Sequence, residues 1–392
     1  MPIDHAQLRR LHEAAQRDRK PHRFFEDLRA GFDGGQLKPE DFSIRRLFEN
    51  FVEGGREIAD SWNPQHGGGG INLVESAVAV DTSAFSNITG QLVYTKMLQA
   101  YQHEDFVFSK LIPTVPTQLN GEKIPGIGEI GDMAETVNEG KPYPTAGVTE
   151  DWIETPATAK TGLIVPVTKE AVFFDRTGFI LTRCGDVGGA LGIGREKRGI
   201  DCIIDENRTG HRYRWRGTTY ATYQASTPFV NIKASNALVD WTDIDGAEQL
   251  FDDLMDPNTG EPIMVSPRHL IVTRQNKNTA QRIVTATRMV STTPGYATTG
   301  NPTETEWQNP YKGLYEVLWS RLLAARMGTD TSWYLGDIGK AFAYMENWPL
   351  TVVQAPNNSE AEFTNDIVFR YKASERGAFA TMEPRAMVKS TA

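Results

Sequence analysis

Hydrophobic positions follow a helical period at the start of the chain, a strand period in its middle and a mixture of both towards its end. In residues 4–30, Leu8, Leu11 and Ala15 recur three or four positions apart, which is the spacing of one helix face. A second short helix is expected after residue 38, where Asp41 can serve the helix N-terminus. The beginning of the chain is therefore predicted to be helical.

The middle of the chain holds two extended segments, 122–130 and 152–167, around a middle rich in glycine and proline. Their β-branched residues predict a long, ordered hairpin. Almost nothing apolar in it could fill a core of its own, and a loop of this kind normally either contacts something outside the fold or is disordered. We expect the hairpin to lie on a partner chain, with Trp152 and Ile153 exposed in an isolated chain. The long hairpin therefore favours a subunit of an assembly over an enzyme.

The longest helical pattern covers residues 178–206. Ile180, Cys184, Val187 and Leu191 recur at helical spacing. Five glycines interrupt the pattern, and each costs up to ~1 kcal/mol against alanine in a helix; they are Gly185, Gly188, Gly189, Gly192 and Gly194. Close packing against another backbone would explain them better than propensity. We therefore predict one long helix whose face at Gly188 and Gly189 is closely packed.

The last half of the chain mixes strand and helix patterns. Aromatic residues alternate with threonine in 211–232, which favours strands. Helices are expected at 247–255 and 276–287, and strands at 263–265, 269–273, 314–320 and 332–337. Three antiparallel strands are expected at 348–353, 366–372 and 377–383. Together with the earlier segments this predicts an α+β fold.

Composition narrows the function classes. The 392 residues allow two or three domains, and the net charge of −9 argues against a surface dominated by nucleic-acid binding. Cys184 and Cys202 stand about 27 Å apart along one predicted helix, too far for a bond within it, so reduced thiols are expected. No apolar run is long enough for a membrane span, and the N-terminus lacks the apolar region of a secretion signal.

None of the short sequence motifs predicts a cofactor, metal or catalytic site. Gly126, Gly128 and Gly131 match a dinucleotide fingerprint but lack its strand and helix context, so they are interpreted as part of a flexible β-arm. The run 212–217 alternates arginines with aromatics, which could stack single-stranded bases but is interpreted as a half-exposed strand. The seven histidines have no metal-ligand spacing, and no nucleophile elbow, Walker loop or zincin motif occurs. We therefore predict no enzyme and no catalytic, cofactor-binding or metal residues.

Four stretches in this order resemble the major capsid protein of tailed bacteriophages, the Hong Kong 97 type: 161–178, 267–287, 309–337 and 366–389. The resemblance implies a phage capsid fold with a helical N-terminal arm, an extended β-hairpin loop, a long spine helix, and peripheral and axial domains. Mapped onto this chain, the arm covers 1–112 and the extended loop 113–168. The spine helix and peripheral domain cover 169–235, the axial domain 236–345 and the peripheral C-terminal strands 346–392.

The resemblance also implies a function. Copies would self-assemble as hexamers and pentamers into the icosahedral head shell around phage DNA, with portal and scaffold or decoration proteins as partners. No membrane is involved, and the location would be the virion capsid, with host cytoplasm during assembly. The alternatives are a bacterial nanocompartment shell of the same fold, which usually has a shorter N-terminus, and a soluble enzyme, which no catalytic set supports.

Two further expectations concern subunit contacts. The arm is expected to be retained, hinged at Gly67–Gly70, and to clamp adjacent subunits through its phenylalanines rather than face DNA; these are Phe24, Phe25, Phe48 and Phe51. Some relatives crosslink a loop lysine to a neighbour's asparagine. Lys141 and Lys160 lie in the loop, and Asn357, Asn358 and Asn365 lie late in the chain, but no spacing rule identifies a pair.

Overall fold

The computed structural model describes residues 5–18, 21–51, 79–125, 137–139, 152–168, 174, 176–205, 212–215, 217–226, 229–255, 262–293, 303–355 and 367–392. The chain forms two compact units. Unit 1 comprises residues 1–104, 160–194 and 348–376, and unit 2 comprises 105–159, 195–347 and 377–392. Each unit is therefore assembled from three separate stretches of sequence.

Unit 1 packs helices against one part of a four-stranded sheet. Its helices are α1 (His5–Arg17), α2 (Pro21–Asp33), η1 (Pro39–Asp41), α3 (Ile44–Phe51), α5 (Ala79–Tyr101) and the first part of α8 (Thr177–Ile204). Its strands are β4 (Ala159–Thr168) and parts of β13 (Phe342–Gln354) and β14 (Ile367–Thr381). The sheet also includes β1 (Thr114–Pro116) and has the order β1-β13-β14-β4. Apolar side chains from β4, β13 and β14 and from α2, α3, α5 and α8 share one core.

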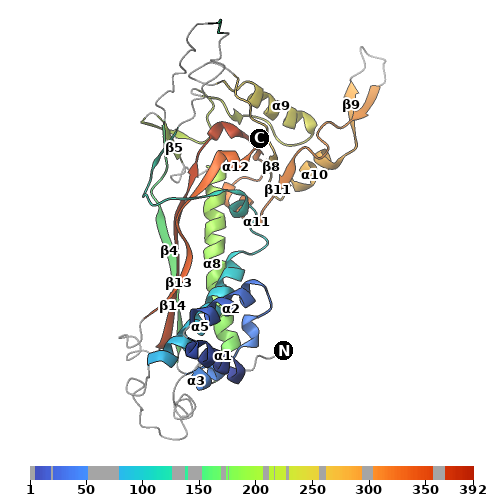
Figure 1. Ribbon diagram of the computed structural model, residues 1–392. Helices are drawn as coiled ribbons and strands as arrows, with labels where there is room; N and C mark the ends of the chain where they lie inside the picture. Colours follow the sequence, from blue (N-terminus) through green and yellow to red (C-terminus); the bar gives the residue numbers. More distant parts are fainter. Residues whose placement is uncertain are drawn as a thin grey trace. The chain divides into compact units, whose positions relative to one another are not determined.

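The helix α8 is one continuous element of 28 residues (Figure 1). The predicted span of 178–206 is therefore confirmed to within two residues at each end. Ile180, Cys184 and Leu191 belong to the core of unit 1, whereas Ile200 and Ile203 belong to a core of unit 2. The 3.6-residue period keeps the buried positions on a stripe along the helix, so a single amphipathic element contributes to both units.

Unit 2 contains the remaining sheets. The five-stranded sheet has the order β11-β8-β12-β15-β7 and consists of β7 (Ile232–Lys233), β8 (His269–Ile271), β11 (Glu316–Leu318), β12 (Trp333–Gly336) and β15 (Met387–Ser390). Every residue of β12 is buried, as expected for a central strand. A four-stranded sheet has the order β2-β3-β5-β6, with β2 (Lys123–Pro125), β3 (Trp152–Glu154), β5 (Arg212–Trp215) and β6 (Thr218–Ala221). A separate hairpin pairs β9 (Arg288–Thr293) with β10 (Thr303–Gln308).

Short helices complete unit 2: α6 (Phe108–Leu111), α9 (Trp241–Asp252), α10 (Lys277–Thr285), α11 (Arg321–Met327), α12 (Ile338–Ala341) and η3 (Pro384–Ala386). Local sequence determines where α9 begins. The Asp240 side chain accepts a hydrogen bond from the backbone N–H of Thr242, and Asp243 reaches back to the backbone N–H of Asp240. This capping box satisfies N–H groups that a helix start otherwise leaves unpaired.

Several predicted elements differ from the structure. Residues 4–30 contain two helices rather than one: α1 ends at Arg17, and α2 begins at Pro21, since proline is a favoured first helical residue. Residues 263–265 are not a strand; only Pro262 makes an isolated bridge, to Met255. The segments expected at 366–372 and 377–383 belong to one strand, β14, which runs through Gly377. A glycine in a strand can mark a close approach rather than a break, and here the Tyr344 ring lies where a Cβ would be.

Both cysteines are free and buried, and burial raises the pKa of each thiol to about 12. At pH 8 the reactive thiolate is then about three orders of magnitude scarcer than for an exposed cysteine of pKa ~8.5. We expect Cys184 and Cys202 to react with a disulfide reagent at least 100-fold more slowly in the folded chain than in guanidinium. Stopped-flow absorbance measures both rates. Equal rates would show that the helix core around α8 is open to solvent.

Candidate assembly surfaces

The return strand of the predicted hairpin is ordered within its own chain. β4 pairs with β14 at one edge of the four-stranded sheet. Val165 and Val167 are buried, but Leu163 is 43% exposed and Ile164 is 58% exposed. An edge strand that carries exposed apolar side chains is a template for contact with another chain. β4 is therefore the first candidate assembly surface.

The expected exposure of the hairpin is wrong at Ile153, which is only 2% exposed. The reason is that β3 pairs with both β2 and β5, and Ile153 joins a core of unit 2 with Leu238 and Phe251. Sequence reasoning missed this pairing because β5 lies far from β3 along the chain. The side chain of Trp152 and residues 126–136 and 140–151 lie outside the described residues, and so do Gly126, Gly128 and Gly131.

The phenylalanines of the N-terminal segment are not available for an intersubunit clamp. Phe24, Phe48 and Phe51 are 8%, 3% and 2% exposed, and Phe25 is half-buried. They pack in the core of unit 1, where His12 makes edge contacts with Phe24, Phe25 and Phe51. The predicted clamp through these side chains is wrong, because α5 supplies an apolar partner within the chain: the Phe48 and Phe85 rings lie 5.6 Å apart. The hinge Gly67–Gly70 lies outside the described residues.

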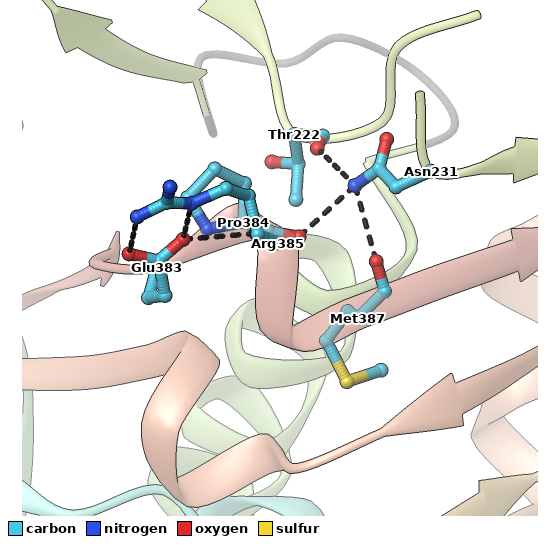
Figure 2. Close-up of polar contacts among 6 residues, drawn as sticks. All are labelled: Thr222, Asn231, Glu383, Pro384, Arg385 and Met387. Carbon is cyan, nitrogen blue, oxygen red and sulfur yellow. Dashed lines mark hydrogen bonds and ion pairs between the residues drawn. The ribbon is translucent and has the colours of Figure 1, made fainter. Parts of the chain in front are cut away.

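Asn231 forms a dense polar junction in unit 2 (Figure 2). Its Nδ2 donates to the carbonyl oxygens of Thr222, Pro384 and Met387 at 3.1, 3.0 and 3.1 Å. Its Oδ1 accepts from the backbone N–H of Gln224 at 2.7 Å. The residue is 0% exposed, so these bonds replace water entirely. Asn231 thus ties the segment after β6 to the C-terminal segment of the chain.

The C-terminal segment carries a buried charge beside this junction. Arg385 is 1% exposed, and its Nε and Nη2 donate to the two carboxylate oxygens of Glu383 at 2.7 and 3.0 Å (Figure 2). A paired fork of this kind compensates the cost of burying a guanidinium. Since β15 begins at Met387, directly after η3, the pair holds the start of the last strand rather than forming a reactive site.

A second buried carboxylate caps a helix. Glu196 of α8 is 0% exposed and accepts hydrogen bonds from the backbone N–H groups of Val107, Phe108 and Ser109 at 3.1, 3.0 and 2.8 Å. These N–H groups belong to the start of α6, where they would otherwise be unpaired. The three hydrogen bonds from α6 therefore account for the buried carboxylate of Glu196.

The arginine and aromatic motif at 212–217 lies in a strand over its described residues. Residues 212–215 form the strand β5, and Arg214 pairs with Glu154 of β3 at 3.0 Å, so the strand interpretation is confirmed. Among the described residues, no cluster of three or more histidine, cysteine or acidic side chains could hold a metal ion. Within the same part of the chain, no helix has the length and apolarity needed to cross a membrane.

The crosslinking candidates are not brought together in the described residues. Lys160 Nζ lies 6.0 Å from the ring centre of Trp348. Lys141, Asn357, Asn358 and Asn365 lie outside the described residues. No lysine–asparagine pair follows from the structure, and none is assigned.

The described residues show an edge strand with exposed apolar side chains and two buried polar junctions. Residues 152–390 match the family model described as phage capsid protein. This range covers more than half of the chain, so the chain belongs to the phage capsid protein family and is a capsid shell protein. The resemblance and the α+β fold class expected from the sequence are thereby confirmed. None of the curated proteins matches the sequence.

Solved structures that are similar to the chain come from phages and from an encapsulin complex. A Gordonia phage Cozz structure is 12% identical with a TM-score of 0.43, over 81% of this chain and 96% of that chain. A Mycobacterium phage Cain structure is 15% identical with a TM-score of 0.41, over 72% and 88%. The SrpI encapsulin of Synechococcus elongatus PCC 7942 is 11% identical with a TM-score of 0.40, over 74% and 90%.

Proposed function

We propose that the chain is the major capsid protein of a tailed phage, and that its copies form hexamers and pentamers of an icosahedral shell around double-stranded DNA. The observation that carries the proposal is the family match over residues 152–390. The exposed edge strand β4 supports it, since an edge of this kind suits contact with a neighbouring copy. Assembly would take place in the host cytoplasm, with portal and scaffold or decoration proteins as further partners.

We also propose the domain assignment that the resemblance implies. Residues 1–112 would act as the N-terminal arm, 113–168 as the extended loop, and 169–235 as spine helix and peripheral domain. Residues 236–345 would form the axial domain and 346–392 the peripheral strands. The protein would act without catalysis or cofactors, because its contribution is binding energy between identical surfaces.

Electron microscopy of particles purified from phage-producing cells tests this function. We expect closed shells that contain nuclease-protected double-stranded DNA and this chain as the most abundant protein. Shells of similar fold that hold a protein cargo and no DNA would instead establish the nanocompartment alternative. A chain that remains monomeric at every concentration would contradict both.

The extended loop is proposed to contact a neighbouring subunit. Deleting residues 130–148 should leave both units folded, because their cores are built from described residues outside that segment. We expect the deletion to keep the circular dichroism and melting temperature of the isolated chain but to reduce the yield of shells at least tenfold. Sucrose-gradient sedimentation measures this yield. A normal yield of shells would show that the loop is not needed for contact.

A further inference from the structure

A groove of about 780 Å³ lies in unit 1 between α2, α5 and the last part of β13. Its apolar walls are Phe25 and Phe32 of α2 and Leu350 and Val352 of β13. Gly90 of α5 also lines the groove, and a Cβ at this position would meet nothing within 4 Å. The groove is therefore open at Gly90, where a larger side chain would enter it.

One edge of β13 is uncovered along this groove. β1 pairs with β13 only over Tyr344–Glu346, and the order β1-β13-β14-β4 places β14 on the opposite edge. Beside residues 348–354 of β13, the described part of the chain therefore has no strand on the β1 side. Residues 349–352 line the groove. An uncovered strand edge of this kind is a template on which a further strand can pair.

Hydrogen bonding on the β14 side determines which backbone groups point to the uncovered edge. The N–H of Ala355 donates to the carbonyl oxygen of Arg370 at 2.9 Å. In an antiparallel pair, both backbone groups of one residue point to one side and those of the next residue point to the other. The N–H and C=O groups of Leu350 and Val352 therefore point away from β14. Both residues line the groove, so it offers backbone donors and acceptors as well as apolar surface.

The polar side chains of the groove favour a peptide over a nucleic acid. Gln91 Oε1 is buried and receives no hydrogen bond within the described part of the chain. Buried polar atoms normally have a partner, and an amide N–H of a bound peptide would supply one. Arg29 is the one arginine among the described lining residues and lies 3.8 Å from Asp33. Since Glu26 also lines the groove, the site has no excess of positive charge for phosphate groups.

We propose that this groove binds an extended segment of a different protein, which adds a strand to the uncovered edge of β13. In this mode of recognition the backbone bonds supply affinity, and alternate side chains of the peptide enter apolar pockets. Phe25, Phe32 and Leu350 would receive those side chains. The described strands of this chain are already paired within their own sheets, so a second copy would have to release a strand in order to fill the groove. A separate protein with an extended segment has no such cost.

A model peptide tests the groove in the isolated full-length chain. The probe is a fluorescent peptide of alternating valine and threonine, about seven residues long to match 348–354, with a lysine at each end for solubility. Fluorescence anisotropy measures its binding. Gly90→Leu is expected to weaken binding at least ~10-fold, because leucine would fill the groove. The matched control is Gly185→Leu on α8, where a Cβ also meets nothing within 4 Å. It should bind within about twofold of the unaltered chain, and both variants should keep its melting temperature.

Two further measurements test strand addition without altering the protein. Methylation of alternate backbone nitrogens of the probe removes its donors but keeps its side chains, and should weaken binding at least ~10-fold. Hydrogen exchange, read residue by residue by mass spectrometry, should slow at least ~10-fold at the amides of Leu350 and Val352 when the probe binds. The amide of Ala355 already bonds to Arg370, so its exchange should not change.

Several outcomes would overturn the proposal. The probe may not bind as well to Gly90→Leu as to the unaltered chain, and its methylated form may not bind as well as the parent peptide. Absence of binding at about 1 mM probe also excludes the site. If the amides of Leu350 and Val352 are protected in shells of the pure chain without peptide, a second copy fills the groove instead. Peptide binding is measured without shells, so its failure is distinct from a failure of the shell function.

Discussion

Replacing Gly188 by alanine is expected to lower the free energy of unfolding by about 1–3 kcal/mol, although alanine favours helices by up to ~1 kcal/mol over glycine. A Cβ at this position would lie 2.2 Å from the carbonyl oxygen of Met97 and 2.8 Å from its Cα atom. These are backbone atoms of α5, so the two helices must separate to admit a methyl group. The steric clash with a backbone cannot be relieved by a change of side-chain rotamer, because the contacting atoms belong to the main chain.

The adjacent glycine is a matched control. A Cβ on Gly189 would meet nothing within 4 Å, so Gly189→Ala should stabilise the chain by up to ~1 kcal/mol through helix propensity alone. Chemical denaturation of both variants measures the difference. If Gly188→Ala is as stable as Gly189→Ala, then α5 and α8 do not approach each other as described.

Replacing Asn231 by aspartate is expected to cost about 3–5 kcal/mol, the range for a buried charge left without a partner. Asparagine Nδ2 donates to three carbonyl oxygens. An aspartate has no donor there when ionised, so its carboxylate would face three acceptors in a site closed to water. Urea denaturation at pH 7 measures the loss of stability.

The same substitution at a surface position separates the effect of charge from that of the junction. Asn278 is exposed on α10. There, Asn→Asp should change the free energy of unfolding by no more than about 0.5 kcal/mol, as is usual for surface changes. Lowering the pH should partly rescue Asn231→Asp, because a protonated carboxyl regains one donor. Equal stability of both variants at pH 7 would contradict the role of Asn231.

Much of the architecture was predictable because it depends on local periodicity. The 3.6-residue recurrence through Ile180, Cys184 and Leu191 predicted α8 nearly to its ends, and the strands β8, β11 and β12 followed from short apolar runs. The helix expected at 247–255 was found as α9, which begins earlier, at Trp241, where Asp240 and Asp243 form a capping box. In each case the residues that determine the element are neighbours in sequence.

Other features depended on partners far away in sequence. Both Gly188 and Gly189 interrupt the α8 pattern, but of the two only Gly188 faces the backbone of α5. Phe24 and Phe51 are apolar residues near the N-terminus, a pattern equally suited to a neighbour or to the chain's own core. Ile153 lies in β3, which pairs with β5, a strand much later in the sequence. The amino-acid type tells how apolar a side chain is. It does not tell which surface buries that side chain, because burial depends on residues that are distant in sequence.

The sequence by itself determined the helical beginning, the long helix α8, the α+β class and the family of shell proteins. Only the tertiary structure decided that the N-terminal phenylalanines are buried within the chain, and that Ile153 is covered where β3 pairs with β2 and β5. The physical reason is that periodicity acts between near neighbours in sequence, whereas burial arises when distant strands such as β4 and β14 pair in one sheet.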